Sequence, residues 1–309
     1  MKKIDLSIII PIYNEEESIV ELYQQINKAI QNKLTYELIF INDGSTDNSF
    51  SVIKQLLLQD DNVKIISFTS NKGKSEALNY GFNNCSGNIV ITIDGDLQDD
   101  PMEFFSLIEK INSGSDMVTG WKKDRKDSIS KKILSKIFNF VLRVLTGIKI
   151  HDFNCGLKAY RSSVVKSIEI FGGRHRYIPA LAGQLGFPVS EIVVNHRPRI
   201  HGETKYGGSR VFHGFFDLLT ILFLNKYTQQ PLHFFGAIGM VAFSGGIITE
   251  LIVLYYKFII FEPFSKHIAL LLLGVILIII GIQFFSIGLL GEIMARFSQD
   301  KEDRIKEIK

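Results

Sequence analysis

The sequence has few cysteines and a low net charge, and each of these features argues against a class of protein. Its two cysteines, Cys85 and Cys155, stand in unrelated contexts without a CxxC spacing, which argues against a disulfide framework and against a cysteine-ligated zinc site. Lysine and arginine number 35 against 32 acidic residues, a net charge of +3. This balance carries no nucleic-acid signature, so nucleic acid is not expected as a partner.

The start of the chain also lacks the pattern of a secretory signal peptide. Residues 1–5 lead directly into a strand pattern with charges and a proline close by, rather than into the apolar stretch of a signal. We therefore expect the N-terminal part to stay in the cytosol. A length of 309 residues is too great for one ordinary small domain and too small for three.

Short apolar runs alternate with helical patterns over roughly the first third of the chain. The apolar runs predict strands at residues 6–12, 36–41, 63–68, 89–93 and 117–120. Helices are expected to follow, opening near Asn14, Thr46, Ser75 and Pro101. This alternation predicts a mostly parallel sheet with helices on both faces. Ligands bind beyond the carboxyl ends of such strands, and the polar clusters of this sequence lie at those ends.

Two amphipathic segments, residues 128–150 and 211–224, break the alternation. Apolar residues recur in them at helical spacing, and basic residues lie among those of the first segment. Either segment fits a core-facing helix or an interfacial helix that rests on anionic lipid. The long apolar runs farther along the chain favour the interfacial interpretation.

Those runs, residues 234–256 and 268–290, predict a pair of transmembrane helices. Each has 23 residues, the first with one acid, Glu250, and the second without charge. At about 1.5 Å per residue, each spans roughly 34 Å. The connection 257–267 has two lysines, whereas the tail 291–309 has five basic residues, which predicts a cytoplasmic tail and N-terminal domain. Glu250 is expected to face the partner helix or another subunit.

An acidic turn, Asp94-Gly95-Asp96, follows the fourth predicted strand. Carboxylates at positions i and i+2 can reach one hard divalent cation, Mg²⁺ or Mn²⁺, together with a diphosphate. The acidic pattern alone is weak evidence for a metal site, but its position at the end of a buried strand strengthens that evidence. Asp99 and Asp100 stand just before Pro101, where helix capping explains them better than metal ligation.

Polar clusters at the ends of the first three strands complete this predicted edge. Asp43 can accept an N–H of a nucleotide base, although a helix cap with a turn would also explain it. Glu15, after the first strand, could hold a ribose hydroxyl. The stretch 71–74 (NKGK) adds a glycine and positive charge that suit a diphosphate.

The motifs PIYNEEES, INDGSTD, NKGKSEALNYG and DGDLQDDP, in this order and spacing, resemble the inverting glycosyltransferases of family 2 with the GT-A fold. This family includes dolichol-phosphate mannose synthase and the bacterial polyprenyl-phosphate glycosyltransferases. The resemblance extends over essentially the whole chain, through the stretches HDFNCGLKAYR and HRPRIHGETKYG and the two apolar runs. The apolar runs are similar to those of the bactoprenol-phosphate glucosyltransferase type.

The resemblance implies an α/β GT-A domain, amphipathic interfacial helices and a C-terminal transmembrane hairpin. The expected parts are a nucleotide-sugar and metal-binding core (1–127), an acceptor-side part (128–231), two transmembrane helices (232–291) and a cytoplasmic tail (292–309). The resemblance assigns nucleotide binding to Pro11, Tyr13, Glu15, Asp43, Lys74 and Asp94. It assigns metal binding to Asp94, Asp96 and Gln98. Catalysis or acceptor contact is assigned to Asp96, Lys131, Ser135, Asp152 and Arg199.

Several positions depart from the family or remain open. The family often has arginine at Lys131 and around Trp121-Lys122-Lys123, so bidentate phosphate binding is lost there. Its usual alanine is Gly95 here, a change that we expect to be harmless. Asp152 fits either an acceptor-orienting residue or a turn residue. Arg197, Arg199 and Lys205 form a basic stretch that could meet either phosphate.

The implied activity is transfer of a hexose-type sugar from a nucleotide diphosphate sugar to polyprenyl phosphate, for cell-envelope glycan modification. UDP-glucose or another UDP-sugar is favoured over GDP-mannose, and the enzyme is expected to be a multi-pass, homo-oligomeric protein of the inner membrane with its catalytic domain in the cytoplasm. No serine–histidine or cysteine–histidine nucleophile stands out, and none is needed, because a lipid phosphate is already ionised and requires mainly positioning and charge stabilisation.

The motifs also bear on two alternative functions. A processive polysaccharide synthase usually carries a QxxRW motif and more spans, whereas the one tryptophan here, Trp121, stands in Gly-Trp-Lys. An inactive membrane scaffold that only binds nucleotide sugar would not need Asp43, Asp94 and Asp96 intact.

Overall fold

The computed structural model describes residues 4–30, 33–123, 129–170, 173–198 and 230–299. The chain divides into two compact units, Met1–Gly208 and Ser209–Lys309, and each is described by itself. Arg199, Lys205 and the predicted amphipathic segment 211–224 lie outside the described residues.

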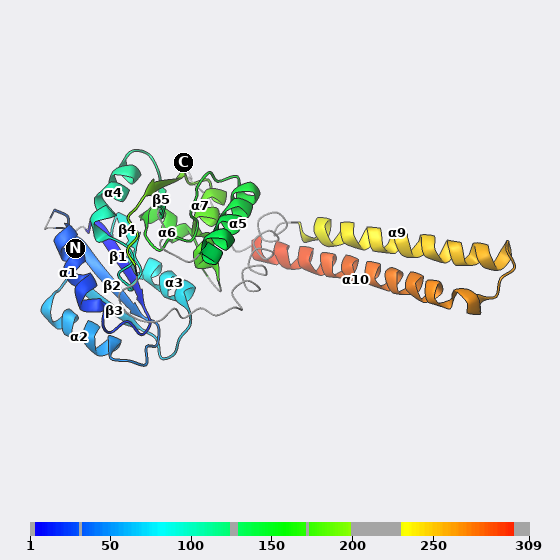
Figure 1. Ribbon diagram of the computed structural model, residues 1–309, viewed down its shortest axis with the longest axis horizontal. Coiled ribbons are helices and arrows are strands. Elements are labelled where there is room, and N and C mark those ends of the chain that lie inside the picture. Colours follow the sequence, from blue (N-terminus) through cyan, green and yellow to red (C-terminus); the bar gives the residue numbers. More distant parts are fainter. Residues whose placement is uncertain (1–3, 31–32, 124–128, 171–172, 199–229, 300–309) are drawn as a thin grey trace. The chain divides into compact units, whose positions relative to one another are not determined.

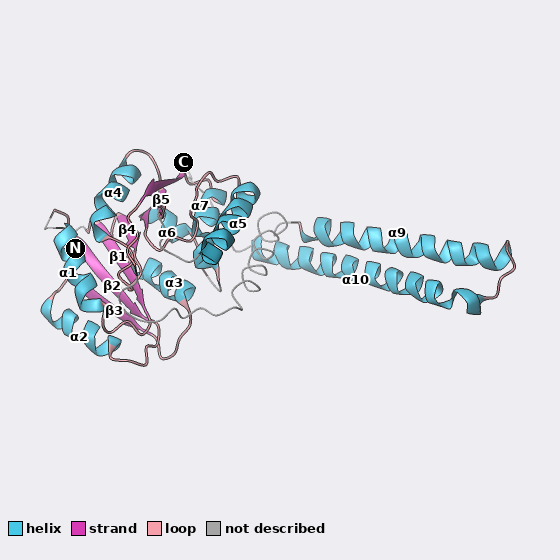
Figure 2. Cartoon of the chain, in the orientation of Figure 1, coloured by secondary structure: helices cyan, strands magenta, loops and turns pink. Residues whose placement is uncertain are grey.

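A seven-stranded sheet forms the centre of the first unit, with strand order β3-β2-β1-β4-β6-β5-β7 (Figures 1 and 2). Its strands are β1 (Leu6–Ile12), β2 (Tyr36–Asn42), β3 (Val63–Ser67), β4 (Ile89–Thr92), β5 (Met117–Trp121), β6 (Lys158–Arg161) and β7 (Val189–Val193). β6 is antiparallel to both neighbours, and every other pairing is parallel. The five predicted strands are confirmed to within two residues, whereas β6 and β7 were not predicted.

Helices cover both faces of the sheet, as the alternation predicted. They are α1 (Ile19–Ile30), α2 (Ser49–Gln59), α3 (Lys74–Asn84), η1 (Pro101–Glu103), α4 (Phe104–Asn112), α5 (Ile129–Thr146), α6 (Ser162–Ser167), η2 (Arg174–Tyr177) and α7 (Ile178–Gln184). β1 shows the two faces: Ile8 and Ile10 join a core with α1, α2 and α4, while Ile9 joins a core with α3, α6 and α7. Successive residues of a strand point to opposite faces, so a continuous isoleucine run serves both cores.

The orientation of β6 brings its first residues to the functional edge of the sheet. Lys158 pairs with Thr92 of β4 and with Thr119 of β5. Because β6 runs against its neighbours, its amino end lies where β4 and β5 have their carboxyl ends. The loop before β6 therefore lies where β4 and β5 end, and its Gly156 packs against Asp94 in the turn after β4.

The second unit contains a helical hairpin, α9 (Pro231–Phe258) and α10 (Ile268–Gln299), with a short η3 (Phe264–His267) between them (Figure 1). Both helices are long and apolar enough to cross a membrane by length and composition, and the predicted spans 234–256 and 268–290 lie inside them. A Cβ at Gly239 would lie 2.8 Å from the carbonyl oxygen of Gly281, and one at Gly246 would lie 2.8 Å from that of Gly274. Small residues thus let the two backbones approach closely.

Glu250 faces the partner helix, one of the two predicted alternatives. A Cβ at Gly274 would collide with the carboxyl group of Glu250. The absence of a side chain at Gly274 therefore leaves the space that this carboxyl group occupies.

Candidate active site

The acidic turn after β4 is held tightly against its surroundings. A Cβ at Gly156, in the loop before β6, would lie 2.5 Å from Oδ2 of Asp94. Ser18 donates a hydrogen bond of 2.6 Å to the carbonyl oxygen of Gly95. A Cβ at Gly95 would lie 2.6 Å from Cδ1 of Ile12, so the alanine usual in the family would require this methyl group to move. The loops after β1 and β4 are thereby fixed to each other.

Asp94 forms an ion pair with Lys74, the first residue of α3. Nζ of Lys74 lies 2.5 Å from Oδ1 of Asp94. Burial would raise the pKa of Asp94, but the charge of Lys74, its hydrogen bond, and the charges of Lys122 and Lys158 lower this pKa to about 2. The carboxylate is consequently ionised at neutral pH.

Of the nucleotide residues predicted at the end of β1, Pro11 belongs to the strand, and Tyr13 and Glu15 lie in the loop after it. Hydrogen bonds tie this loop to the loop after β2. Pro11, Tyr13 and Glu15 are half-buried at this end of β1. Asn14 has a positive φ of 53°; its backbone N–H donates to Ser45, and its side-chain oxygen accepts from the backbone N–H of Thr46 at 2.8 Å. The backbone N–H of Glu15 donates to Ser49. These hydrogen bonds fix the loops after β1 and β2 to each other.

Asp43 organises the loop that precedes α3. Its two carboxylate oxygens accept from the backbone N–H groups of Lys72 and Gly73, at 2.7 and 3.0 Å. Burial raises the pKa of Asp43, an effect that these two N–H groups partly offset. A carboxylate has about four lone-pair sites, so these bonds leave capacity for the predicted contact with a nucleotide base. Gly44, with φ of 66° and no room for a Cβ beside Asn71, allows the close approach.

The predicted acceptor residues belong to α5 and to the loop before β6. Asn139 links them: its side chain donates to Ser135 at 3.3 Å and accepts from the backbone N–H of Phe153 at 3.2 Å. Asp152 is 3% exposed and accepts from the backbone N–H of Asn154, a contact typical of a turn residue. Lys131 lies in the first turn of α5, and its side chain lies outside what the structure describes.

Arg197, one of the basic residues considered from the sequence for either phosphate, contacts the segment that follows the acidic turn. Its guanidinium lies 2.6 Å from Oδ2 of Asp100 and donates to Gln25 at 2.7 Å. Its backbone N–H donates to the carbonyl oxygen of Gln98. Arg197 therefore fastens the segment after β7 to the turn after β4. Asp100 also accepts from the backbone N–H of Met102 at the start of η1, which confirms its predicted capping role.

Three basic residues lie near the acidic turn although no sequence motif assigns them to it. Lys122, at the end of β5, is 9% exposed and lies 2.7 Å from Oδ1 of Asp99. Lys158 is buried and donates to the carbonyl oxygen of Cys155. His175 shares a 2.9 Å hydrogen bond with Ser75. Burial, together with the charge of Lys74, holds the pKa of His175 well below its ordinary value, so this imidazole is neutral.

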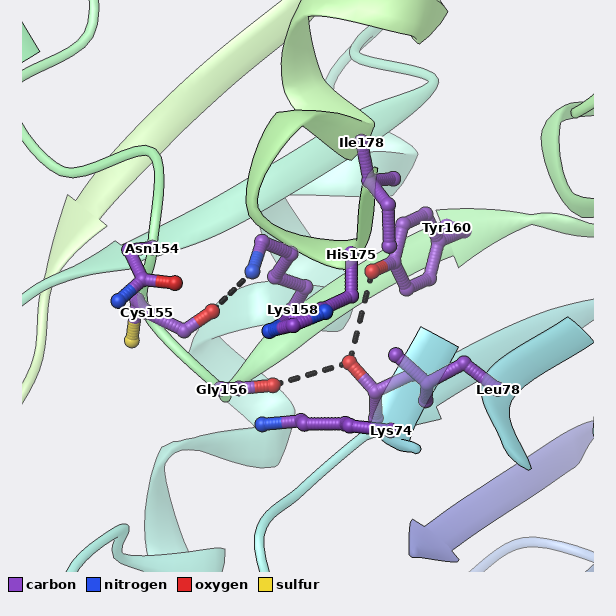
Figure 3. Close-up of a pocket in the computed structure, with 10 residues that line it drawn as sticks. Lys74, Leu78, Asn154, Cys155, Gly156, Lys158, Tyr160, His175 and Ile178 are labelled. Carbon is purple, nitrogen blue, oxygen red and sulfur yellow. Dashed lines mark hydrogen bonds between the residues drawn. The ribbon is translucent and has the colours of Figure 1, made fainter. Parts of the chain in front are cut away.

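A small pocket lined by Lys74 and Gly156, the two neighbours of Asp94, brings together residues from several parts of the chain. Figure 3 shows Lys74 from α3, Lys158 from β6, His175 from η2, and Asn154 from the loop before β6 around it. The pairing of β6 with β4 is what places Lys158 here. A sequence signal for this arrangement is lacking, because it depends on an antiparallel strand inserted between two parallel ones.

The two carboxylates of the turn fit a divalent cation that is completed by its substrate. Within the described part of the chain, no three acidic, histidine or cysteine residues gather as a self-sufficient metal site. Mg²⁺ typically binds through one or two carboxylates plus substrate phosphates and water. Asp94 and Asp96 match that donor set, and Gln98 is half-buried two residues beyond.

Comparisons with known proteins agree with this geometry. Residues 7–169 match Glycosyl transferase family 2. The chain is 34% identical over 305 residues to the dodecaprenyl-phosphate galacturonate synthase of Rhizobium johnstonii, covering 96% of this chain and 89% of that protein. It is 35% identical over 301 residues to the undecaprenyl-phosphate 4-deoxy-4-formamido-L-arabinose transferase of Shewanella sediminis, covering 97% and 89%.

A solved structure supports the fold assignment. Glucosyl-3-phosphoglycerate synthase from Mycobacterium tuberculosis, in complex with Mn²⁺, UDP-glucose and phosphoglyceric acid, matches with a TM-score of 0.55 at 18% identity, over 72% of this chain and 79% of that one. Two near-full-length relatives are named for products or acceptors built on a polyprenyl phosphate. The chain therefore belongs to family 2 of the glycosyltransferases, with the GT-A fold, and to its polyprenyl-phosphate glycosyltransferases.

Proposed function

We propose that this chain is a divalent-cation-dependent, inverting glycosyltransferase that moves a sugar from a UDP-sugar to polyprenyl phosphate at the cytoplasmic face of the inner membrane. The observation that carries the proposal is the meeting, at one edge of the sheet, of the Asp94–Asp96 turn with the loop that Asp43 organises. The near-full-length similarity to enzymes of polyprenyl-phosphate sugars supports the choice of acceptor.

The nucleotide sugar is held from several directions in this proposal. Pro11, Tyr13 and Glu15 contact the nucleoside, and Asp43 contacts the base while it shapes the loop 71–74. Asp94, Asp96 and Gln98 hold Mg²⁺ or Mn²⁺, which when bound supplies positive charge to the diphosphate as it leaves. Lys74 adds a further positive charge on the same side.

The reaction itself needs no strong base. An oxygen of the ionised acceptor phosphate forms a bond to the anomeric carbon, while the bond from that carbon to the diphosphate breaks and the diphosphate leaves with the electron pair. Attack from the opposite face inverts the anomeric centre. The protein contributes orientation and charge stabilisation. This suits a site whose nearby imidazole, His175, is a weak base, because burial holds its pKa well below its ordinary value.

The acceptor side of the proposal is α5 with the loop before β6. Phe140 and Val144, one turn apart on α5, are 61% and 65% exposed, and Lys136 on the same side is exposed. Apolar and basic side chains on one helix surface suit the interface of an anionic bilayer. Lys131 and Ser135 would then hold the lipid phosphate, with Arg199 as a further cation and Asp152 orienting the acceptor loop.

The hairpin of α9 and α10 supplies the membrane anchor in this proposal. Both helices cross the bilayer, the connection between them lies on the far side, and the tail lies in the cytoplasm with the catalytic unit. The charge difference between the connection and the tail supports this orientation. Assembly into a homo-oligomer is part of the same proposal.

The test is a transfer assay with the purified full chain in lipid or detergent. Radiolabelled UDP-glucose, UDP-galacturonate and GDP-mannose are each offered with undecaprenyl phosphate. We expect label from a UDP-sugar in an organic-soluble, acid-labile product, and loss of transfer when EDTA removes divalent cations. Label that enters a water-soluble polymer instead would favour the processive synthase, and the absence of transfer from all three nucleotide sugars would contradict the proposal.

A further inference from the structure

Lys74 forms an ion pair with Asp94, the carboxylate that a metal cation would also bind. Its Nζ lies 2.5 Å from Oδ1 of Asp94, and the two side chains are 28% and 31% exposed. The pair is therefore reachable by a nucleotide sugar that enters from solvent. Asp94 is also the first carboxylate of the proposed metal site, so lysine and metal compete for the same group.

The surroundings leave little room for both cations at Asp94. Gly156 packs directly against the carboxylate, where even a Cβ would lie 2.5 Å from Oδ2. Lys158 and Lys122 add positive charge to the field at Asp94. Like charges repel, so a divalent ion is attracted less strongly to Asp94 while the ammonium group of Lys74 remains in place.

Lys74 stands at the end of a loop that can serve a diphosphate. Gly73, immediately before it, has φ of 91° and nothing within 4 Å of its Cβ position, and its backbone N–H is held by Asp43. A lysine carries its charge on a flexible four-carbon stem. Its ammonium group can therefore leave Asp94 and reach an incoming phosphate group without a change in the backbone.

We propose that Lys74 is a positioning residue that substitutes for the metal at Asp94 in the free enzyme and transfers to the diphosphate when the nucleotide sugar arrives. Release of Lys74 is favourable only when the diphosphate offers it a new anionic partner. Metal and nucleotide consequently bind as a coupled pair rather than independently, and the metal site stays closed until the nucleotide is present. This inference rests on the proposed function.

The coupling is measured by titrating Mn²⁺ into the full chain and following free Mn²⁺ by electron paramagnetic resonance, alone and with UDP or GDP. In the unaltered protein we expect weak Mn²⁺ binding that one of the nucleotides tightens by about tenfold or more, within the usual range of coupling between ligands. In Lys74→Met, Mn²⁺ alone should bind about tenfold more tightly, and the tightening by nucleotide should shrink several-fold. Lys74→Arg, which keeps the charge, should behave as the unaltered protein does.

Lys72→Met is the matched control for the titration with Mn²⁺ alone. Its ammonium group lies over the ring of Phe68, 5.3 Å from the ring centre, in a cation–π contact. It removes the same charge from the same loop, so Mn²⁺ affinity without nucleotide should change little. Lys74→Gln serves as a second neutral variant if Lys74→Met does not fold.

The outcomes separate the inference from the proposed function. If Mn²⁺ binds together with a nucleotide but its affinity alone is the same in Lys74→Met, Lys74→Gln and the unaltered protein, the inference is overturned while the metal-dependent function stands. An equal gain in affinity in Lys72→Met would also overturn it, because the effect would then be one of general charge. If no protein binds Mn²⁺ even with UDP or GDP, the proposed metal dependence fails and the inference fails with it.

Discussion

Gly156 lies directly against the carboxylate of Asp94, with its Cβ position 2.5 Å from Oδ2. The two residues come from different loops, one before β6 and one after β4, and the antiparallel insertion of β6 brings them together. A single methyl group at position 156 therefore tests whether the position of Asp94 matters for activity.

Gly156→Ala should lower metal-dependent transfer by about a hundredfold, since a displacement of about 1 Å in a reacting constellation has effects of this size. The measurement is the initial rate of transfer as a function of Mn²⁺ concentration, with circular dichroism to check folding. Gly245→Ala is the control, because a Cβ there meets nothing within 4 Å. Full activity in a folded Gly156→Ala protein would show that Asp94 tolerates displacement and would weaken its assignment.

Asp96→Asn tests the second carboxylate of the turn. The substitution keeps the shape of the side chain but removes its charge, so we expect the rate of transfer to fall by about a hundredfold or more, with the protein folded and in the membrane fraction. Rates are compared at saturating Mg²⁺ and Mn²⁺. Near-normal turnover of the purified variant with either ion would remove Asp96 from the metal site.

The strands that the sequence predicts correctly are continuous apolar runs or mostly apolar, whereas the missed strand β6 is equally buried but short and flanked by charges. β1 and β2 are continuous apolar runs because both of their faces lie in a core. β6 has only four residues, and its sequence KAYR begins with a lysine and ends with an arginine. Its strand character comes from pairing with β4 and β5, which are distant in sequence, so neither periodicity nor composition reveals it.

The candidate site likewise contains some features that the sequence predicts and others that it does not. Glu15, Asp43, Asp94 and Asp96 each follow a predicted parallel strand, so their common edge follows from topology alone. Partnerships across the sheet do not follow from topology. The ion pair of Lys122 with Asp99 and the placement of Arg197 on Asp100 depend on tertiary packing that local patterns do not encode.

The orientation of the hairpin is tested with reporter fusions in cells. A reporter at the C-terminus, after Lys309, should report the cytoplasm, and one inserted at Pro263 between α9 and α10 should report the far side. The basis is the excess of basic residues in the tail over the connection. Cytoplasmic signals at both positions would mean that the helices do not cross, and exchanged signals would reverse the proposed topology.

Lys131→Ala tests α5 as the acceptor-binding helix. Ser135, one turn along the helix, is joined through Asn139 to the loop that contains Asp152, so this side of α5 borders the acceptor part of the site. The exposed Phe140 and Val144 would place the helix at the depth of lipid headgroups. A charge-assisted contact with phosphate contributes about 1.5–3 kcal/mol. Its loss should reduce kcat/KM for polyprenyl phosphate roughly ten- to a hundredfold.

The affinity for nucleotide should hardly change in Lys131→Ala, because Asp43 and the Asp94–Asp96 turn lie on other loops. Acceptor kinetics and UDP affinity are therefore measured separately in this variant. Lys136→Ala is the comparison variant, since Lys136 is an exposed lysine of the same helix, on the side of Phe140 and Val144. It removes an equal charge from the proposed membrane surface of α5 and should lower acceptor use clearly less than Lys131→Ala does. If Lys136→Ala matched Lys131→Ala, the effect would be a general attraction of α5 to anionic lipid. If Lys131→Ala weakened UDP binding and left acceptor kinetics intact, α5 would serve the nucleotide and not the lipid.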